Sequence, residues 1–270
     1  MNSSKKKVSV IVTTYNRPDA LKRVIQGLLF QTRVPDEVVI ADDGSSEETQ
    51  NLVKGFINSS DQCRIAHVWQ EDKGFRAAQI RNLAIKKTTG EYIISLDGDC
   101  IPEAHFIEDH LKLAKKGFFF QGKRLLVGKN LSKSFAFEDT KLKTKLLWQS
   151  LKNELSNIHH TFRVPFFPAL TTTKLSGIKS CNMGFFRKDL YSVNGFNQDF
   201  IGWGREDSEL AARLYNLGLK RREHPFLAVC FHLWHDENKK DRIGINDTLL
   251  KEQMESKLIT CKNGIEIKSN

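Results

Sequence analysis

The stretch "VSVIVTTYNRPDALKRVIQGLLFQT", residues 8–32, changes its hydrophobic period part-way along. Residues 8–15 are rich in β-branched side chains and form a nearly continuous apolar run, which predicts a buried strand. Residues 17–32 instead carry leucine, valine and isoleucine at helical spacing. The stretch therefore predicts one β-α unit.

The same alternation continues up to residue 99. Strands are predicted at 36–45, 63–70 and 91–99, and helices at 46–57 and 75–90. Strands that alternate with helices favour a parallel sheet with right-handed crossovers, in which ligands bind beyond the carboxyl ends of the strands. The polar groups "TTYNR", "DDGSS" and "DGD" follow the first, second and fourth predicted strands, so we expect a ligand site there.

The pattern becomes less regular from about residue 117. Two short strands are predicted over 117–128, and a basic amphipathic helix with its leucines on one side is predicted over 139–158. Because the chain has no internal repeat and no low-complexity linker, we expect one domain over 1–270. Its expected parts are a nucleotide-sugar-binding half (7–128), an acceptor-binding half (129–240) and a C-terminal tail (241–270).

The composition, with 40% hydrophobic residues, is that of a globular chain that can bury a core. The sequence has no signal-peptide pattern and no window near the roughly 20 apolar residues of a membrane span, so we expect a cytoplasmic protein. Five cysteines without CxxC spacing indicate free thiols. A net charge of +10 indicates an anionic partner, which could be nucleic acid, an acidic membrane surface or a phosphorylated small molecule.

Asp97 and Asp99 lie two residues apart in "SLDGD", where the fourth predicted strand ends. Two carboxylates this close repel each other and resist burial. A divalent cation held by oxygen ligands would remove the repulsion and could bridge the pair to a diphosphate. Since Asp and Gly also favour turns for local reasons, the motif alone leaves both interpretations open.

The segment "GWGRED", residues 202–207, starts another predicted helix. Glu206 and Asp207 complement the helix dipole there, which is the simplest explanation for acidic residues in a first turn. However, Trp203 between two glycines suits a platform on which a sugar ring stacks while the backbone comes close. A carboxylate beside such a platform could accept a proton from a hydroxyl group, so we favour a functional role.

His232 and His235 lie three residues apart after the apolar stretch "FLAVC". Imidazoles are common metal ligands, although most histidines bind no metal. Carboxylates combined with imidazole suit manganese or magnesium better than a zinc site built on thiolates. Arg17, Arg76 and Arg81 could supply cations for a diphosphate, although solvated helix faces account for most arginines.

Taken together, "VSVIVTTYNRPDALKRVIQGLLFQT", "VVIADDGSSEETQNLV", "GFRAAQIRNLAI", "GEYIISLDGDCIP" and "GFNQDFIGWGREDSELAARLYNLG" resemble the family 2 glycosyltransferases. The C-terminal part resembles the galactosyltransferase-type C-terminal module of chondroitin-polymerase-like enzymes and β1,4-galactosyltransferases. The resemblance implies the GT-A fold, an α/β fold with a mainly parallel central sheet flanked by helices. It also implies inverting, metal-dependent transfer of one hexose or N-acetylhexosamine from a UDP-sugar to a hydroxyl group of a glycan acceptor. Such a reaction would serve bacterial-type surface polysaccharide or lipopolysaccharide synthesis.

The resemblance also implies residue roles, position by position, with Mn²⁺ (or Mg²⁺) as the cofactor. The donor would contact Thr13, Tyr15, Arg17, Asp42, Asp43, Arg76 and Asp97. The metal ligands would be Asp99, His232 and His235. The acceptor would contact Asn182, Trp203 and Glu206, and Asp207 would be the catalytic base.

Two other functions compete with this interpretation. A nucleotidyltransferase that makes sugar nucleotides would share the sheet and the metal, but "TTYNRPDA" lacks the glycine-rich phosphate loop expected after the first strand. A non-enzymatic basic binding module would explain the net charge. We instead expect no nucleic-acid partner, and we interpret the basic helix over 139–158 as a peripheral contact with the inner face of the cell membrane, useful if the acceptor is a lipid-linked glycan.

Overall fold

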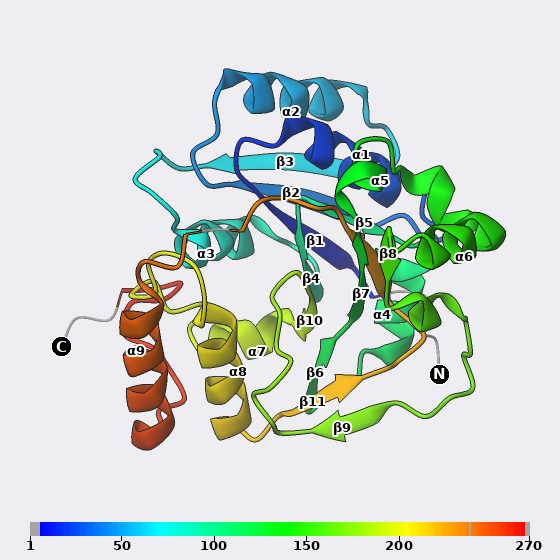
Figure 1. The fold of residues 1–270 in the computed structure, drawn as a ribbon. Helices are drawn as coiled ribbons and strands as arrows, with labels where there is room; N and C mark the ends of the chain where they lie inside the picture. Colours follow the sequence, from blue (N-terminus) through cyan, green and yellow to red (C-terminus); the bar gives the residue numbers. More distant parts are fainter. Residues whose placement is uncertain (1–5, 238, 268–270) are drawn as a thin grey trace.

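The structure, a computed structural model, describes residues 6–237 and 239–267 (Figure 1). Its first part confirms the predicted alternation of strands and helices. The elements are β1 (Val8–Thr14), α1 (Pro18–Leu29), β2 (Glu37–Asp42), α2 (Glu47–Ser59), β3 (Arg64–Trp69), α3 (Ala77–Lys87) and β4 (Tyr92–Asp97). Strands β3, β2, β1 and β4 are neighbours in one sheet and run parallel. Their carboxyl ends therefore meet at one edge of the sheet.

The rest of the chain extends this sheet to eight strands in the order β3-β2-β1-β4-β10-β6-β11-β9. Strand β10 pairs antiparallel with β4, so the sheet is parallel from β3 to β4 and mixed beyond β4. The added elements are α4 (Phe106–Leu113), β6 (Phe118–Gln121), β9 (Leu170–Thr172), β10 (Asn182–Phe186), α7 (Arg187–Ser192), α8 (Glu206–Asn216) and β11 (Lys220–Glu223). The predicted α/β fold class is confirmed.

A second sheet sets the position of His232. It has four strands in the order β5-β12-β7-β8. Their bounds are β5 (Cys100–Pro102), β7 (Lys123–Val127), β8 (Leu155–Ser156) and β12 (Val229–His232). In the antiparallel pairing of β12 with β5, His232 lies opposite Cys100, and the N–H of Leu233 donates to the carbonyl of Asp99 at 2.9 Å. Backbone pairing therefore brings His232 beside Asp99 from 133 residues along the chain, the difference between 232 and 99.

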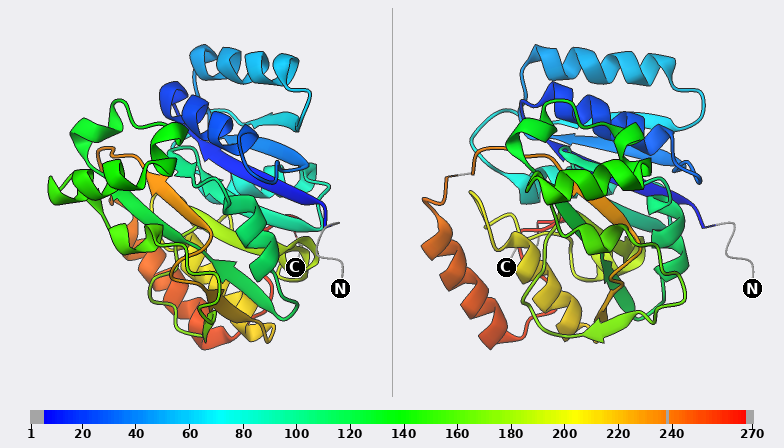
Figure 2. Two further views of the ribbon diagram at one scale, coloured as in Figure 1. Left: turned by 90° about the vertical axis from the view of Figure 1, so that its right-hand side faces the viewer. Right: turned by 45° about the vertical axis from the view of Figure 1, so that its right-hand side comes forward.

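Two hydrophobic clusters cover the two faces of the main sheet. Val10 and Val12 of β1 belong to the cluster that contains the buried side of α1, whereas Ile11 belongs to the cluster that contains α3 and α8. This alternation is expected of a strand that is buried on both faces. In the views of Figures 1 and 2, α1 and α2 lie at one end of the molecule and α8 at the other.

The helix predicted over 139–158 is wrong in extent. That region contains the end of the 3₁₀ helix η2 (Phe137–Lys141), the helix α6 (Lys143–Leu151), strand β8 and the start of the 3₁₀ helix η3 (Ile158–Thr161), and the short helix α5 (Lys129–Ser132) precedes it. Asn153 and Asn157 adopt left-handed backbone angles, with φ of 58° and 63°, which an α-helix does not accept. Within α6, Leu146 is buried, but Leu147 and Leu151 are exposed.

The segment after residue 240, expected as a polar tail, contains a further helix, α9 (Ile243–Ser256), which packs against α8. The side chain of Asn246 is buried and donates to the carbonyls of Ile201 and Gly204 at 3.3 and 2.9 Å. Ile265 is also buried, within the cluster that contains α3 and α8. The segment thus supports the loop that precedes α8. No helix of the described ranges is both long and apolar enough to cross a bilayer.

Candidate active site

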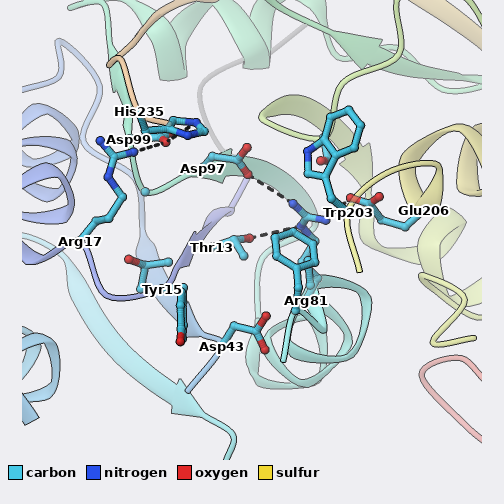
Figure 3. Close-up of a pocket in the computed structure, with 15 residues that line it drawn as sticks. Thr13, Tyr15, Arg17, Asp43, Arg81, Asp97, Asp99, Trp203, Glu206 and His235 are labelled. Atoms are coloured by element: carbon cyan, nitrogen blue, oxygen red, sulfur yellow. Dashed lines mark hydrogen bonds and ion pairs between the residues drawn. The ribbon is translucent and has the colours of Figure 1, made fainter. Parts of the chain in front are cut away.

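A pocket opens where the parallel strands end, as the sequence predicts (Figure 3). Its lining includes the predicted residues Thr13, Tyr15, Arg17, Asp43, Asp97, Asp99, Trp203, Glu206 and His235. Strand register explains this grouping, because Thr13 of β1 lies opposite Asp97 of β4. The loop before α8 then brings Trp203 and Glu206 to the same opening (Figure 3).

Asp99, His232 and His235 form a cluster at one end of the pocket. One ligand atom from each lies within 4.8 Å of the others, an arrangement that could hold a metal ion. The Nε2 atoms of His232 and His235 lie 3.6 and 3.4 Å from the two carboxylate oxygens of Asp99. Burial lowers the pKa of His232 to about 4, so this imidazole is neutral at pH 7 and has a free lone pair.

Arg17 reaches the same cluster from the start of α1. Its Nη1 donates to Oδ2 of Asp99 at 2.6 Å, and its Nη2 donates to the carbonyl of Trp234 at 3.2 Å. Asp97 lies outside the metal cluster, although it is only two residues from Asp99. The two carboxylates therefore have different partners, Arg17 for Asp99 and Arg81 for Asp97.

Arg81 of α3 links several side chains that line the pocket. It is only 4% exposed, and it donates to the side chains of Thr13, Asp97 and Glu206 at 3.3, 3.3 and 2.9 Å. Burial raises the pKa of Asp97 to about 6, although the guanidinium of Arg81 opposes the rise. A single buried cation thus joins β1, β4 and α8 (Figure 3).

From sequence, Arg81 is only one of several arginines that could serve a diphosphate, and the resemblance gives the donor role to Arg76. The structure places the Arg76 guanidinium outside the pocket, bonded to Oε1 of Gln79 at 3.0 Å and to the carbonyl of Glu71. One signal was available in the sequence: Arg81 follows Ala77 by four residues and precedes Ala84 by three. It therefore lies on the apolar stripe of α3, where a charge requires a partner.

The carboxylates of Asp42 and Asp43 lie in different surroundings. Asp43 lines the pocket, where its carboxylate accepts the N–H of Arg76 at 2.8 Å and the side-chain amide of Gln70 at 2.5 Å. Burial raises the pKa of Asp43 above its ordinary value. Asp42 is fully buried and does not line the pocket, because its carboxylate accepts the N–H of Ser45 at 2.8 Å and lies 3.1 Å from Nε2 of His67.

Tyr15 and Asn182 also differ in position. The exposed Tyr15 lies at the mouth of the pocket, and its hydroxyl donates to Asp72 at 2.8 Å. Asn182, predicted to contact the acceptor, is 1% exposed in β10 and lies outside the pocket. Its amide group bonds His110 Nε2 and the carbonyl of Ala228, both at 2.9 Å. The structure therefore gives Asn182 a packing role between two sheets.

The loop before α8 depends on left-handed backbone angles. Gly202 and Gly204 have φ of 79° and 102°, and Arg205 has φ of 80°. Only glycine reaches such angles without strain, so the two glycines permit the turn that leaves Trp203 39% exposed at the pocket. The predicted platform residue is thus held on a specific turn.

Asp207 lies in an adjoining cavity that shares Asp97, Ser180, Trp203 and Glu206 with the pocket. Its Oδ1 accepts the N–H of Ser208 at 2.7 Å, and its Oδ2 accepts the N–H of Ser180 at 3.2 Å. Burial, with a contribution from the neighbouring carboxylate of Glu206, raises the pKa of Asp207 to about 7. A carboxylate with this pKa is suited to accept a proton near neutral pH.

Comparison with known families decides the classification. Residues 9–172 match the family described as "Glycosyl transferase family 2". The chain belongs to this family. Residues 164–236 match the family described as "N-terminal domain of galactosyltransferase", so the resemblance found from the motifs is confirmed.

Curated relatives of this glycosyltransferase family 2 chain include a glucosyltransferase and a chondroitin synthase. The chain is 28% identical over 231 residues to a validoxylamine A glucosyltransferase of Streptomyces hygroscopicus subsp. limoneus, with 78% of this chain and 48% of the relative covered. It is 26% identical over 234 residues to chondroitin synthase of Escherichia coli, with 78% of this chain and 32% of the relative covered. The chain therefore spans about half or less of the length of these relatives.

Solved structures share the fold of this family 2 chain. A mannosyltransferase from Pyrobaculum calidifontis in complex with GDP-Man and Mn²⁺ matches with a TM-score of 0.58 and 19% identity, over 95% of this chain and 65% of the other. GalNAc-T7 with UDP, GalNAc and Mn²⁺ matches with a TM-score of 0.64 and 13% identity, over 87% of this chain and 45% of the other. The predicted GT-A fold is confirmed.

Proposed function

We propose that this chain is an inverting, metal-dependent glycosyltransferase that moves one hexose or N-acetylhexosamine from a UDP-sugar to a hydroxyl group of a glycan acceptor. The observation that carries the proposal is the arrangement of the pocket in this family 2 chain. At one end of the pocket lies the cluster of Asp99, His232 and His235, which could hold a metal ion. At its other end the pocket adjoins the cavity of Asp207. Names of relatives such as chondroitin synthase support a role in surface polysaccharide or lipopolysaccharide synthesis.

Asp99, His232 and His235 fit a bound Mn²⁺. Their one carboxylate and two imidazoles suit Mn²⁺ better than Mg²⁺, because Mg²⁺ prefers oxygen ligands. When bound, the ion would neutralise charge on the departing diphosphate. The complexes of the two structural neighbours with Mn²⁺ support this assignment.

Other residues of the pocket would contact the substrates directly. Arg17, beside Asp99, would bind a phosphate oxygen of the donor, and Asp97 and Asp43 would accept hydrogen bonds from the ribose and the base. Tyr15, exposed at the mouth, would contact the base. Trp203 would stack on a sugar ring.

Asp207 would take the proton of the acceptor hydroxyl as that oxygen attacks the anomeric carbon and the bond from that carbon to the UDP oxygen breaks. Asp97 and Glu206 of the same cavity pair with Arg81, whereas Asp207 accepts only from uncharged donors, the N–H groups of Ser180 and Ser208 and the Ser208 hydroxyl, among the described residues. Among the three carboxylates of this cavity in the described part of the chain, Asp207 alone lacks an ion pair. One displacement with one base inverts the anomeric centre.

Replacing Asp99 by alanine tests the metal assignment. We expect Mn²⁺ to tighten UDP binding to the wild type, and we expect Asp99→Ala to weaken UDP binding in the presence of Mn²⁺ by at least about tenfold, since a carboxylate ligand is removed. Isothermal titration calorimetry with UDP, with and without Mn²⁺, measures both. The exposed Asp61→Ala variant is the matched control. Equal Mn²⁺-dependent affinity in Asp99→Ala and the wild type would contradict the assignment.

A peripheral contact with the membrane is part of the proposal. On α6, Leu147, Trp148 and Leu151 are 50%, 57% and 74% exposed, and Lys152 lies over the Trp148 ring at 5.1 Å. Exposed apolar groups beside lysines suit an anionic bilayer surface. Five buried, unpaired cysteines fit a reducing compartment, in line with a cytoplasmic location.

Sedimentation with phosphatidylglycerol vesicles tests this contact. We expect the double variant Trp148→Ser with Leu151→Ser to lower the partition coefficient by roughly tenfold or more, because two apolar side chains are lost from the contact. The exposed Ile57→Ser variant on α2 controls for lost surface hydrophobicity elsewhere. If the wild type does not sediment with vesicles, the membrane contact is wrong.

A further inference from the structure

The cavity of Asp207 continues into a third cavity that leads away from the donor pocket. The two cavities share Arg124, Lys179 and Cys181, and the third also has Asn157 and His160 in its lining. We call these two cavities the acceptor-side groove. It begins at Asp207 and reaches β7 and the loop before β10.

The cations along this groove differ in their partners. Lys123 pairs with Glu223, Arg205 with Asp247 at 2.5 Å and Lys240 with Glu237 at 2.6 Å. In contrast, Arg124 and Lys179 have no carboxylate within 4.0 Å in the ranges that the structure describes.

Arg124 is the more informative of these two cations. Its side chain is partly buried, and its Nη1 donates to a neutral sulfur, Sγ of Cys181, at 3.5 Å. A guanidinium that is partly removed from water without a carboxylate in ion-pair contact is costly, and an arriving carboxylate or phosphate would offset that cost with a bidentate contact.

We infer that Arg124 and Lys179 form a subsite for an anionic group, a carboxylate or a phosphate, on the acceptor glycan. The inference rests on the proposed function, because it takes the hydroxyl at Asp207 as the acceptor hydroxyl. Neither cation lines the donor pocket, where Arg17 and the Asp99 cluster serve the diphosphate. Both line the cavity of Asp207, so an anion on the acceptor sugar would reach them.

Binding of three matched probes tests the inference, in the presence of UDP and Mn²⁺. The probes are methyl β-D-glucopyranoside, methyl β-D-glucuronide and methyl β-D-glucopyranoside 6-phosphate, and NMR titration measures their affinities. We expect one anionic probe to bind wild type at least about tenfold more tightly than the neutral probe, and the stronger of the two identifies the anion as carboxylate or phosphate.

The variants Arg124→Gln and Lys179→Gln should each lose most of this preference. Arg124→Lys should keep part of it, because the charge remains but the bidentate geometry is lost. Lys54→Gln, on the exposed surface of α2, controls for a lost positive charge and should keep the full preference. Lys179 is exposed, so its variant reports on the subsite even if Arg124→Gln does not fold.

Three results would overturn the inference. The first is equal binding of neutral and anionic probes by the wild type. The second is a loss of UDP affinity in Arg124→Gln as large as that in Asp99→Ala, because Arg124 would then serve the diphosphate while the proposed function stands. The third is absence of Mn²⁺-dependent UDP binding by the wild type, which removes the proposed function as well.

Discussion

Replacing Asp207 by asparagine is expected to slow sugar transfer by about 10²- to 10⁴-fold, the usual contribution of a general base. Asparagine keeps the shape of the side chain and one acceptor oxygen but cannot take the hydroxyl proton. UDP affinity in the presence of Mn²⁺ should change little, because Asp207 does not line the donor pocket. Rates of UDP release and calorimetry with UDP separate the two effects, and the exposed Asp61→Asn variant is the control.

The pH dependence of the wild type gives a second test of Asp207. Its pKa is raised to about 7, so the base is protonated at low pH, and the transfer rate should rise with pH and level off above about 7. The raised pKa also has a consequence for stability. Folding favours the protonated carboxyl, so this contribution to stability is full below the ordinary carboxyl pKa and is lost as pH rises through about 7.

The Asp207→Asn variant has no carboxyl group to deprotonate at this position, so it lacks this loss of stability as pH rises. We therefore expect its melting temperature, relative to that of the wild type, to be higher at pH 8 than at pH 5. A variant that melts below the wild type by the same amount at both values would indicate a merely structural role. Thermal unfolding followed by circular dichroism at the two pH values decides between these outcomes.

Replacing Arg81 by methionine is expected to lower the free energy of unfolding by about 3–5 kcal/mol, the usual cost of removing one partner of a buried ion pair. The change leaves the carboxylates of Asp97 and Glu206 without their cation, and it removes the contact of the guanidinium with the Phe196 ring at 5.3 Å. Urea denaturation at pH 7 measures the loss. The matched control is Arg76→Met, whose guanidinium donates to the Gln79 side chain and the Glu71 carbonyl and has no ion pair with a carboxylate of the described residues.

A second substitution distinguishes charge from packing at Arg81. Adding Glu206→Gln to Arg81→Met removes one of the two stranded charges, so the double variant should recover part of the lost stability. If Arg76→Met is as destabilising as Arg81→Met, or if Glu206→Gln worsens the loss, the central role given to Arg81 is wrong.

The strands and the site at their carboxyl ends could be predicted from sequence, because both depend on local sequence patterns. Apolar runs predicted β1 and β4, and parallel strands bring their carboxyl ends together, so Thr13 and Asp97 could be assigned to one edge of the sheet. The spacing of His232 and His235 suggested a shared site. Their meeting with Asp99 depends on the pairing of β12 with β5, which no local pattern in the sequence encodes.

Other features depend on interactions across the fold. Asp42 and Asp43 are adjacent in sequence, yet of the two only Asp43 lines the pocket, since Asp42, the last residue of β2, is buried beside Ser45 and His67. Asn182 is held by His110 and Ala228 from elsewhere in the chain. The predicted helix over 139–158 had a helical leucine period, but two left-handed asparagines interrupt the region, and residue identity alone does not fix such angles.

The measurement that tests the central claim most directly is release of UDP from UDP-Gal, UDP-Glc, UDP-GalNAc and UDP-GlcNAc by the purified chain, with and without Mn²⁺. We predict that at least one donor is turned over, that Mn²⁺ increases the rate, and that Asp99→Ala and Asp207→Asn both abolish most of it. If no UDP-sugar is turned over and no Mn²⁺-dependent UDP binding is detected, the proposal that this family 2 chain transfers sugar from UDP is contradicted.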